Sequence, residues 1–586
     1  MKAPSEVRRP ASFSQIPLDK TFWQSLRCPG ITTHAGEIEL LARQIPERLA
    51  VLRYKQSMGL PWVILIGGTG TGKSTLFNAI CGKTLSETGV ERPKTSGPVA
   101  FVHRDAALGD GLPFPPMVIE GIPVESVGPP GQAGTPGAMV GIRHEDASMG
   151  HFILVDTPDV DSVEPRNRQA VEALYLLADV VIFVASQEKY ADDVPFRFLM
   201  RVIREGKLCF AVLNKGDSMT VAAEVLSSLG AHGLELDPEK FWVFPHIPVH
   251  PSSGLAKTSV FEGFRASLFH ALAPTETGRL MAAEAMRFSR QLESGIRRLH
   301  ELLVLEDEAA RGWLEHLEVF FEAACQNLLE QQQKHFTEGS REVLQKEIRK
   351  HFSKYDLLRT PRRMVSEIVL TPFQLLGLVG DKAPESHQDE LLRVLQRIDL
   401  VPVKAAMEGF NRAVLEKLSP RDPSSPLYGE LRSPAVVLTD EEVRAIVREE
   451  QDRLIGWLEG TFEELARGIP RSKEWGIYST SILWGGLILS LEAAIGGGIT
   501  ILEAVLDTAV APFVTKGAVE LFAYHELQKI ARELGKRYQD GLVSSLRMQK
   551  ERYVQCLTSL SLPQDTLLRL KKLEKDASAN AGGHDK

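Results

Sequence analysis

The stretch Gly67-Gly-Thr-Gly-Thr-Gly72-Lys73-Ser74 decides the fold of this 586-residue chain. It has the form G-x-x-x-x-G-K-[ST], follows the apolar run Trp62–Ile66 and precedes a helical run. This is the strand–loop–helix context that a phosphate-binding loop (P-loop) requires. Its glycines let successive backbone N–H groups curl around phosphates at the positive end of the helix dipole. The sequence therefore predicts a nucleotide site at this loop.

Each polar group of the loop has an expected role. Lys73 places a positive charge on the β- and γ-phosphates and counts as catalytic, and the Ser74 hydroxyl is a ligand for Mg²⁺. Asp156, at the end of the apolar run Phe152–Val155, is placed to hold the same Mg²⁺ through water. The predicted phosphate contacts are Gly67, Gly70, Gly72, Lys73, Ser74 and Thr75.

A second motif, Asn214-Lys215-Gly-Asp217, follows the apolar run Phe210–Leu213. The Asp217 carboxylate can accept the two N–H donors of a guanine edge, and adenine would leave this buried acceptor unpaired. We therefore predict a guanine site made by Asn214, Lys215 and Asp217. Ser252 follows a further strand-like run, Phe241–Phe244, and is a weaker candidate for the last base-contacting loop.

Between the P-loop and Asp156 lies the segment Arg92-Pro-Lys-Thr95-Ser-Gly-Pro98. A threonine here can reach Mg²⁺ and the γ-phosphate when the loop closes. We expect Thr95 to be a metal ligand and to take part in catalysis, with the adjacent Ser96 as the alternative.

Around these motifs, short apolar runs alternate with helical stretches, which is typical of buried, mostly parallel strands in an α/β sheet. Residues 1–35 form an irregular arm, and residues 36–275 form one domain that starts with a helix. Glycine and proline between Gly109 and Gly141 indicate a long inserted loop. The segment Met139–Val155 has the pattern of an antiparallel hairpin.

Residues 62–257 resemble the TRAFAC class of P-loop GTPases, closest to the Era-like and dynamin-like branches. The resemblance is carried by GGTGTGKSTLFNAICGK, RPKTSGP, LVDTPDVDS and LNKGD. It implies a mostly parallel six-stranded sheet with bound GTP or GDP and Mg²⁺. It also implies that Thr95 is the switch I threonine and that Asp156-Thr-Pro-Asp159 is the switch II motif.

Three positions depart from the patterns of the class. Asp159 replaces the glycine of the D-x-x-G motif, and its carboxylate adds like-charge repulsion near the γ-phosphate. Val160 stands where classical small GTPases carry the glutamine that positions water. Thr69 stands where dynamins carry their P-loop glutamine. The sequence names no group that orients the attacking water, and slow GTP hydrolysis, raised by dimerisation or a partner, is expected.

After about residue 275 the strand pattern gives way to an all-α region. Helical spacing defines a stalk-like part at 276–418 and a second part at 435–574, before a solvated, disordered tail at 575–586. The second part opens with a capping box, in which Thr439 and Glu442 bond each other's backbone N–H groups.

An apolar block at 475–515 suggests a helical hairpin. No charged residue occurs from Trp475 to Leu491, and Gly496–Gly498 can form a turn. Two helices of about twenty residues would each reach roughly 30 Å, the thickness of a bilayer core. However, Glu503 and Asp507 favour partial burial against protein, or an interfacial position, for the second helix. Membrane contact and a hairpin packed inside a helical bundle both remain open.

The composition argues against several classes of protein. The net charge is -8 and the pI is near 6.1, and no long basic run occurs, which gives no support to nucleic-acid binding. The five scattered cysteines favour a reducing compartment over a disulfide framework or zinc site. The N-terminus lacks the apolar stretch of a secretory signal.

Three functions fit these patterns. The first is a dynamin-like GTPase at the cytoplasmic face of a membrane, binding lipid through 475–515 and dimerising through its GTPase domains. The second is a soluble Era-like regulatory GTPase that acts on a protein or ribonucleoprotein partner. The third is a structural GTP binder with negligible turnover.

Overall fold

The computed structural model divides into two compact units. Unit 1 comprises residues 1–26, 37–302 and 563–586, and unit 2 comprises residues 27–36 and 303–562. The domain limits given by the sequence stay predictions. The structure describes residues 20–87, 97–106, 108, 112–113, 118–128, 131, 138–186, 193–215, 219–247, 251–335, 401–467, 529, 533, 536–537 and 539–582.

Unit 1 is built on an eight-stranded sheet with the order β3-β4-β2-β5-β1-β6-β7-β8. Its neighbouring strands are parallel except for β2 and β5, which are antiparallel. The strands are β1 (Trp62–Gly67), β2 (Val99–His103), β3 (Val118–Pro123), β4 (Ala138–His144), β5 (Ile153–Asp156), β6 (Val180–Ser186), β7 (Leu208–Asn214) and β8 (Phe241–Val243).

The prediction of six strands is therefore wrong, although the prediction of a mostly parallel α/β sheet is confirmed. The two additional strands are β3 and β4, at the edge beyond β2. β3 lies within the segment 109–141, which was predicted to be a loop. The prediction failed because β3 contains Gly121 and ends at Pro123, and these residues are typical of turns. Proline is tolerated at a sheet edge, where its missing N–H removes no ladder hydrogen bond.

The predicted hairpin at Met139–Val155 is also wrong. β4 and β5 are not neighbours, because β2 lies between them and pairs with both. The pairing depends on β2, which comes earlier in the chain. The local alternation of apolar and polar residues cannot reveal such a partner.

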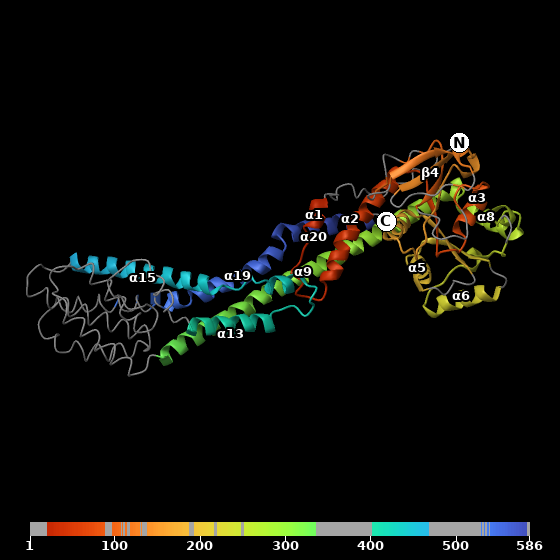
Figure 1. The fold of residues 1–586 in the computed structure, drawn as a ribbon. Helices are drawn as coiled ribbons and strands as arrows, with labels where there is room; N and C mark the ends of the chain where they lie inside the picture. Colours follow the sequence, from red (N-terminus) through yellow and green to blue (C-terminus); the bar gives the residue numbers. More distant parts are fainter. Residues whose placement is uncertain are drawn as a thin grey trace, which may run out of the picture. The chain divides into compact units, whose positions relative to one another are not determined.

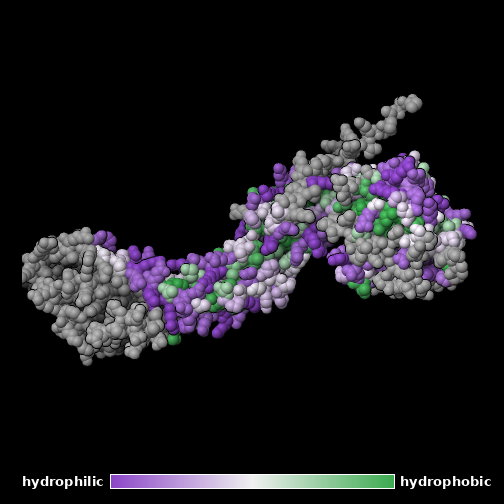
Figure 2. Space-filling view, turned by 45° about the horizontal axis from the view of Figure 1, so that its top comes forward, coloured by the Kyte–Doolittle hydropathy of each residue, from purple (hydrophilic) through white to green (hydrophobic). Residues whose placement is uncertain are grey.

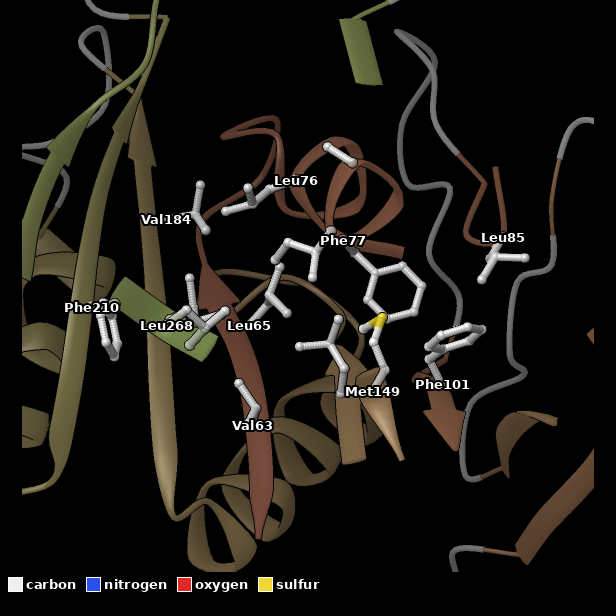
Figure 3. Close-up of a cluster of buried hydrophobic side chains, with 14 of the residues drawn as sticks. Val63, Leu65, Leu76, Phe77, Leu85, Phe101, Met149, Val184, Phe210 and Leu268 are labelled. Carbon is white, nitrogen blue, oxygen red and sulfur yellow. The ribbon is translucent and has the colours of Figure 1, made fainter. Parts of the chain in front are cut away.

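Two helical layers cover the sheet. On one face, α3 (Lys73–Cys81), α7 (Pro251–Leu255) and α8 (Ser259–Ala271) pack on the side chains of Val63 and Leu65. Figure 3 shows Val63 and Leu65 of β1 in this cluster with Leu268 of α8, and Phe77 of α3 beside Met149. On the other face, α4 (Pro165–Leu177) contacts β1, and α5 (Asp193–Arg204) contacts β6 and β7. With both faces covered, β1 is buried along its whole length.

The remaining helices of unit 1 are labelled in Figure 1 where there is room. They are α1 (Lys20–Gln24), α2 (Ala35–Ser57), which begins just before this unit, α6 (Met219–Ala231), α20 (Gln564–Gly582) and the first part of α9 (Pro274–His335). Short 3₁₀ turns are Val124–Ser126, Ala147–Met149 and Pro238–Lys240. α20 continues past residue 575, where the sequence suggested a tail.

In its described part, unit 2 consists of helices and the irregular segments that join them, without a strand. It contains the rest of α9, α13 (Val401–Lys417), α14 (Pro426–Leu431), α15 (Asp440–Arg467) and α19 (Ser544–Leu560). Its core includes Trp313, Phe410 and Tyr553. The buried Gln549 of α19 donates to Val436 O at 3.0 Å and accepts from Leu438 N at 2.9 Å, which fixes α19 against the segment before α15.

The apolar block 475–515 lies outside the described residues. Within the described ranges, no helix combines the length and the hydropathy needed to cross a membrane. In Figure 2, hydrophilic residues cover most of the visible coloured surface, with small hydrophobic patches between them.

Candidate nucleotide-binding site

The P-loop joins β1 to α3 and has the backbone of a phosphate-binding loop. Gly70 and Gly72 have φ angles of 74° and 96°, in the left-handed region that favours glycine. A Cβ atom at Gly72 would lie 2.1 Å from Asn214 Nδ2, and one at Gly67 would lie 2.0 Å from Val184 O. Gly72 is therefore required by both conformation and close packing, Gly70 by its conformation and Gly67 by close packing.

Lys73 lies at the start of α3 with its side chain only 5% exposed. Its ammonium group donates to the carbonyl oxygens of Gly67 and Gly68 at 3.0 and 3.1 Å. It also forms an ion pair with the Asp159 carboxylate. The charge of Lys73 is thus held over the P-loop, where phosphates would lie.

Asp156 ends β5 beside the P-loop and is completely buried. Its Oδ2 atom accepts hydrogen bonds from the hydroxyls of Ser74 at 2.6 Å and Ser86 at 2.7 Å. Burial raises the pKa of the Asp156 carboxyl, while these hydrogen bonds and the nearby charge of Lys73 lower it. The two hydrogen bonds and the charge of Lys73 therefore compensate only partly for the burial of this carboxylate.

This donor set fits Mg²⁺. The Asp156 Oδ1 atom is buried and has no hydrogen-bond partner among the described residues. An acceptor of this kind is costly to leave unpaired, and a cation would satisfy it. Carboxylate and hydroxyl oxygens are the hard ligands that Mg²⁺ prefers. Asp156 and Ser74 are thus suitably placed to hold the ion, directly or through water.

Asn214 and Lys215 lie at the end of β7 and contact the P-loop. Asn214 donates to Thr71 O at 2.9 Å, and Lys215 donates from its ammonium group to Gly70 O at 3.2 Å. Lys215 has a φ of 58°, and its N–H donates to Asn214 Oδ1 at 3.0 Å. Both side chains therefore stabilise the loop conformation, and a guanine contact for them stays a prediction.

The other predicted site residues have different outcomes. Thr75 belongs to α3, next to Ser74. Ser252 lies half-buried in α7, which packs on α3, but no base contact for it follows. Thr95 and Asp217 lie outside the described residues.

Sequence reasoning missed three side chains that organise the site, which are Asn78, Ser86 and Asp161. Asn78 of α3 accepts from the N–H groups of Leu85 and Ser86, each at 2.8 Å, and donates to Ser86 O at 2.8 Å. This clamp holds the Ser86 hydroxyl on Asp156. The third is Asp161, which accepts from Thr69 N and Thr69 Oγ at 2.9 and 2.7 Å. The sequence shows that Asp161 follows the switch II motif by two residues, but it does not show that Asp161 binds Thr69 of the P-loop.

The family model described as 50S ribosome-binding GTPase matches residues 62–215. That range runs from the first residue of β1 through the P-loop and Asp156 to Lys215. Residues 62–215 form a P-loop GTPase domain. The predicted resemblance to this class is confirmed.

A curated relative matches part of the chain at low identity. An uncharacterized protein in the xynA 3′ region of Caldicellulosiruptor sp. (strain Rt8B.4) is 25% identical over 187 residues, which make up 30% of this chain and 46% of that relative. The matched region thus spans about half the length of that curated relative.

Two solved structures of an oligomerised bacterial dynamin pair are 14% and 12% identical, with TM-scores of 0.39 and 0.41. They cover 92% and 98% of this chain, and 91% and 96% of their own. Era in complex with MgGDPNP and nucleotides of 16S ribosomal RNA is 16% identical, covers 36% of this chain and 57% of its own, and has a TM-score of 0.23. At these TM-scores the likenesses support no conclusion about function.

Proposed function

We propose that the GTPase domain binds GTP with Mg²⁺ and hydrolyses it slowly. The observation that carries this proposal is the hydrogen bond between the buried Asp156 and the half-buried Ser74, beside the ammonium group of Lys73, at the carboxyl ends of β1 and β5. Parallel α/β sheets bind ligands at this edge. Phosphoryl transfer requires mainly positioning and electrostatic stabilisation, which these groups can supply.

The residues divide the work as follows. Backbone N–H groups from Gly67 to Thr75 bind the phosphates, and Lys73 neutralises charge on the β- and γ-phosphates. Ser74, Asp156 and Thr95 hold Mg²⁺, which supplies further charge neutralisation. Asn214 and Lys215 brace the loop, while Asp217, together with Ser252, selects guanine.

Lys73→Ala tests this assignment. The variant is expected to lose measurable binding of a fluorescent GTP analogue, because removing one partner of a buried charge pair costs about 2–5 kcal/mol, or more than about thirtyfold in affinity. Lys83→Ala, an exposed lysine just after α3, is the matched control and retains binding. Competition with unlabelled GTP and ATP reports base selectivity in the same assay.

Unchanged affinity in Lys73→Ala would refute the site. Equal competition by ATP would refute the guanine assignment alone. Tight GTP binding without phosphate release would favour the third reading, a structural GTP binder.

We further propose that the protein is a membrane-associated, dynamin-like GTPase in which nucleotide controls membrane contact. Support for this step comes from the sequence: the uncharged run Trp475–Leu491, the three glycines Gly496–Gly498, which can form a turn, and their place after a long helical region. The alternative is a soluble Era-like switch that acts on a protein or ribonucleoprotein partner. Liposome flotation separates the two.

A further inference from the structure

Three consecutive residues after β5 are tied to the P-loop. Asp159 forms an ion pair with Lys73, the Val160 N–H donates to Gly67 O at 3.2 Å, and Asp161 accepts from Thr69. We call residues 159–161 the acidic strap. It crosses the loop with a carboxylate at each end and a backbone hydrogen bond in the middle.

The Asp161 end is the firmer anchor. Its carboxylate takes both the N–H of Thr69, at 2.9 and 3.2 Å, and the Thr69 hydroxyl, at 2.7 Å. Hydrogen bonds to an ionised acceptor are roughly twice as strong as those between neutral groups. Asp161 also lies near the loop backbone, since a Cβ at Gly68 would be in ordinary van der Waals contact, at 3.4 Å, with Asp161 Oδ2.

The Asp159 end meets the group that a phosphate needs. The ammonium of Lys73 is only 5% exposed, and the carboxylate paired with it is 22% exposed. A γ-phosphate would approach the same ammonium and would bring its own negative charge next to Asp159 and Asp161. In a partly buried site such like-charge repulsion is screened only weakly.

We propose that the acidic strap sets the nucleotide preference of the domain by disfavouring the γ-phosphate. Asp159 competes with GTP for the charge of Lys73, and Asp161 holds the strap in the position where it competes. GDP, which has no γ-phosphate, meets less of this repulsion. The strap therefore shifts the relative affinity towards GDP. This inference rests on the proposed function of the site.

The test is the ratio of the dissociation constants for GDP and a non-hydrolysable GTP analogue, measured on the full chain with Mg²⁺. Asp159→Asn keeps the size of the side chain and removes its charge. We expect the variant to bind the GTP analogue about tenfold more tightly relative to GDP, which corresponds to about 1.4 kcal/mol. Asp161→Asn should shift the ratio in the same direction.

Glu164→Gln is the matched control. Glu164 lies in the same loop, is exposed, and its side chain accepts a hydrogen bond from Arg166 N at the start of α4. The control should leave the ratio unchanged, so an equal shift there would overturn the strap as a specific cause.

The outcomes separate this inference from the proposed function. If wild type and variants bind both nucleotides with one unchanged ratio, the strap proposal is wrong and the site assignment stands. If none of the proteins binds either nucleotide, the site assignment fails and the strap proposal falls with it. Because the readout is a ratio, a general loss of folded protein does not imitate the expected shift.

Discussion

At the scale of single residues, Asp156 shows how burial and hydrogen bonding are balanced at the site. The carboxylate is fully buried, which raises its pKa, and two serine hydroxyls favour its charged form. Ser74 comes from the P-loop helix, whereas Ser86 is brought in by the Asn78 clamp. The clamp therefore positions one of the two hydroxyls that favour the charged form of the residue expected to hold the metal.

Ser86→Ala removes one of these hydrogen bonds without touching the P-loop. We expect the free energy of unfolding to fall by about 1.5–3 kcal/mol, the contribution of a hydrogen bond to a charged group. Urea denaturation measures the change. The gain in nucleotide affinity on adding Mg²⁺ should also decrease, because Asp156 becomes harder to keep ionised.

Ser57→Ala is the control for this substitution, since Ser57 is exposed at the end of α2 and its hydroxyl donates to Tyr54 O at 2.8 Å, away from the site. Wild-type stability and an undiminished Mg²⁺ effect in Ser86→Ala would show that Ser74 alone supports Asp156.

At the scale of elements, the start of α15 confirms a prediction in detail. Thr439 N donates to Glu442 Oε2 at 2.8 Å, and Glu442 N donates to Thr439 Oγ1 at 3.3 Å, which is the predicted capping box. Glu442 also forms an ion pair with Arg552 of α19. The hydrogen bond from the Thr439 backbone and the contact with Arg552 lower the pKa of Glu442 to about 2. One residue thus caps a helix and contacts its neighbour.

Thr439→Ala is expected to destabilise unit 2 by about 1 kcal/mol, because the first turn of α15 loses the acceptor for the Glu442 N–H. Thermal denaturation followed by circular dichroism measures the change. Thr439→Ser keeps the hydroxyl and should retain wild-type stability. Equal loss in both variants would assign the effect to packing of the threonine methyl group rather than to the cap.

At the scale of the whole molecule, the open question is what the segment 475–515 contacts. Its composition permits a membrane or a protein core, and its second half contains two carboxylates, Glu503 and Asp507. The two settings differ in one property that can be measured directly, which is the partition of the full chain onto lipid.

We predict that the wild-type chain floats with liposomes of anionic phospholipid, that GTP changes the fraction bound, and that deletion of 475–515 abolishes flotation. If neither protein floats and the deletion variant is insoluble, the block is part of a protein core. That result would favour the Era-like alternative. It would leave the proposal of GTP binding unchanged.

Much of unit 1 follows from local sequence. The motif at Gly67–Ser74 predicts β1, the tight loop and the start of α3, because glycine spacing and an apolar run are local signals. In α9, Leu292, Ile296 and Leu299 stand at helical spacing and are all buried, which is likewise a local pattern. Pairing between distant strands is not local, so the sequence did not reveal that β2 lies between β4 and β5, and β3 was missed.

The sequence by itself determined the nature of the site: a P-loop, a strand-end aspartate and a GTPase domain between residues 62 and 215. These depend on residue types at fixed spacing along the chain. Only the tertiary structure decided that Asp159 and Asp161 contact the P-loop. It also decided that the hydroxyls of Ser74 and Ser86 both donate to Asp156. Such contacts join segments far apart in the chain. They depend on which strands meet and where buried charges find partners, and no single segment encodes either.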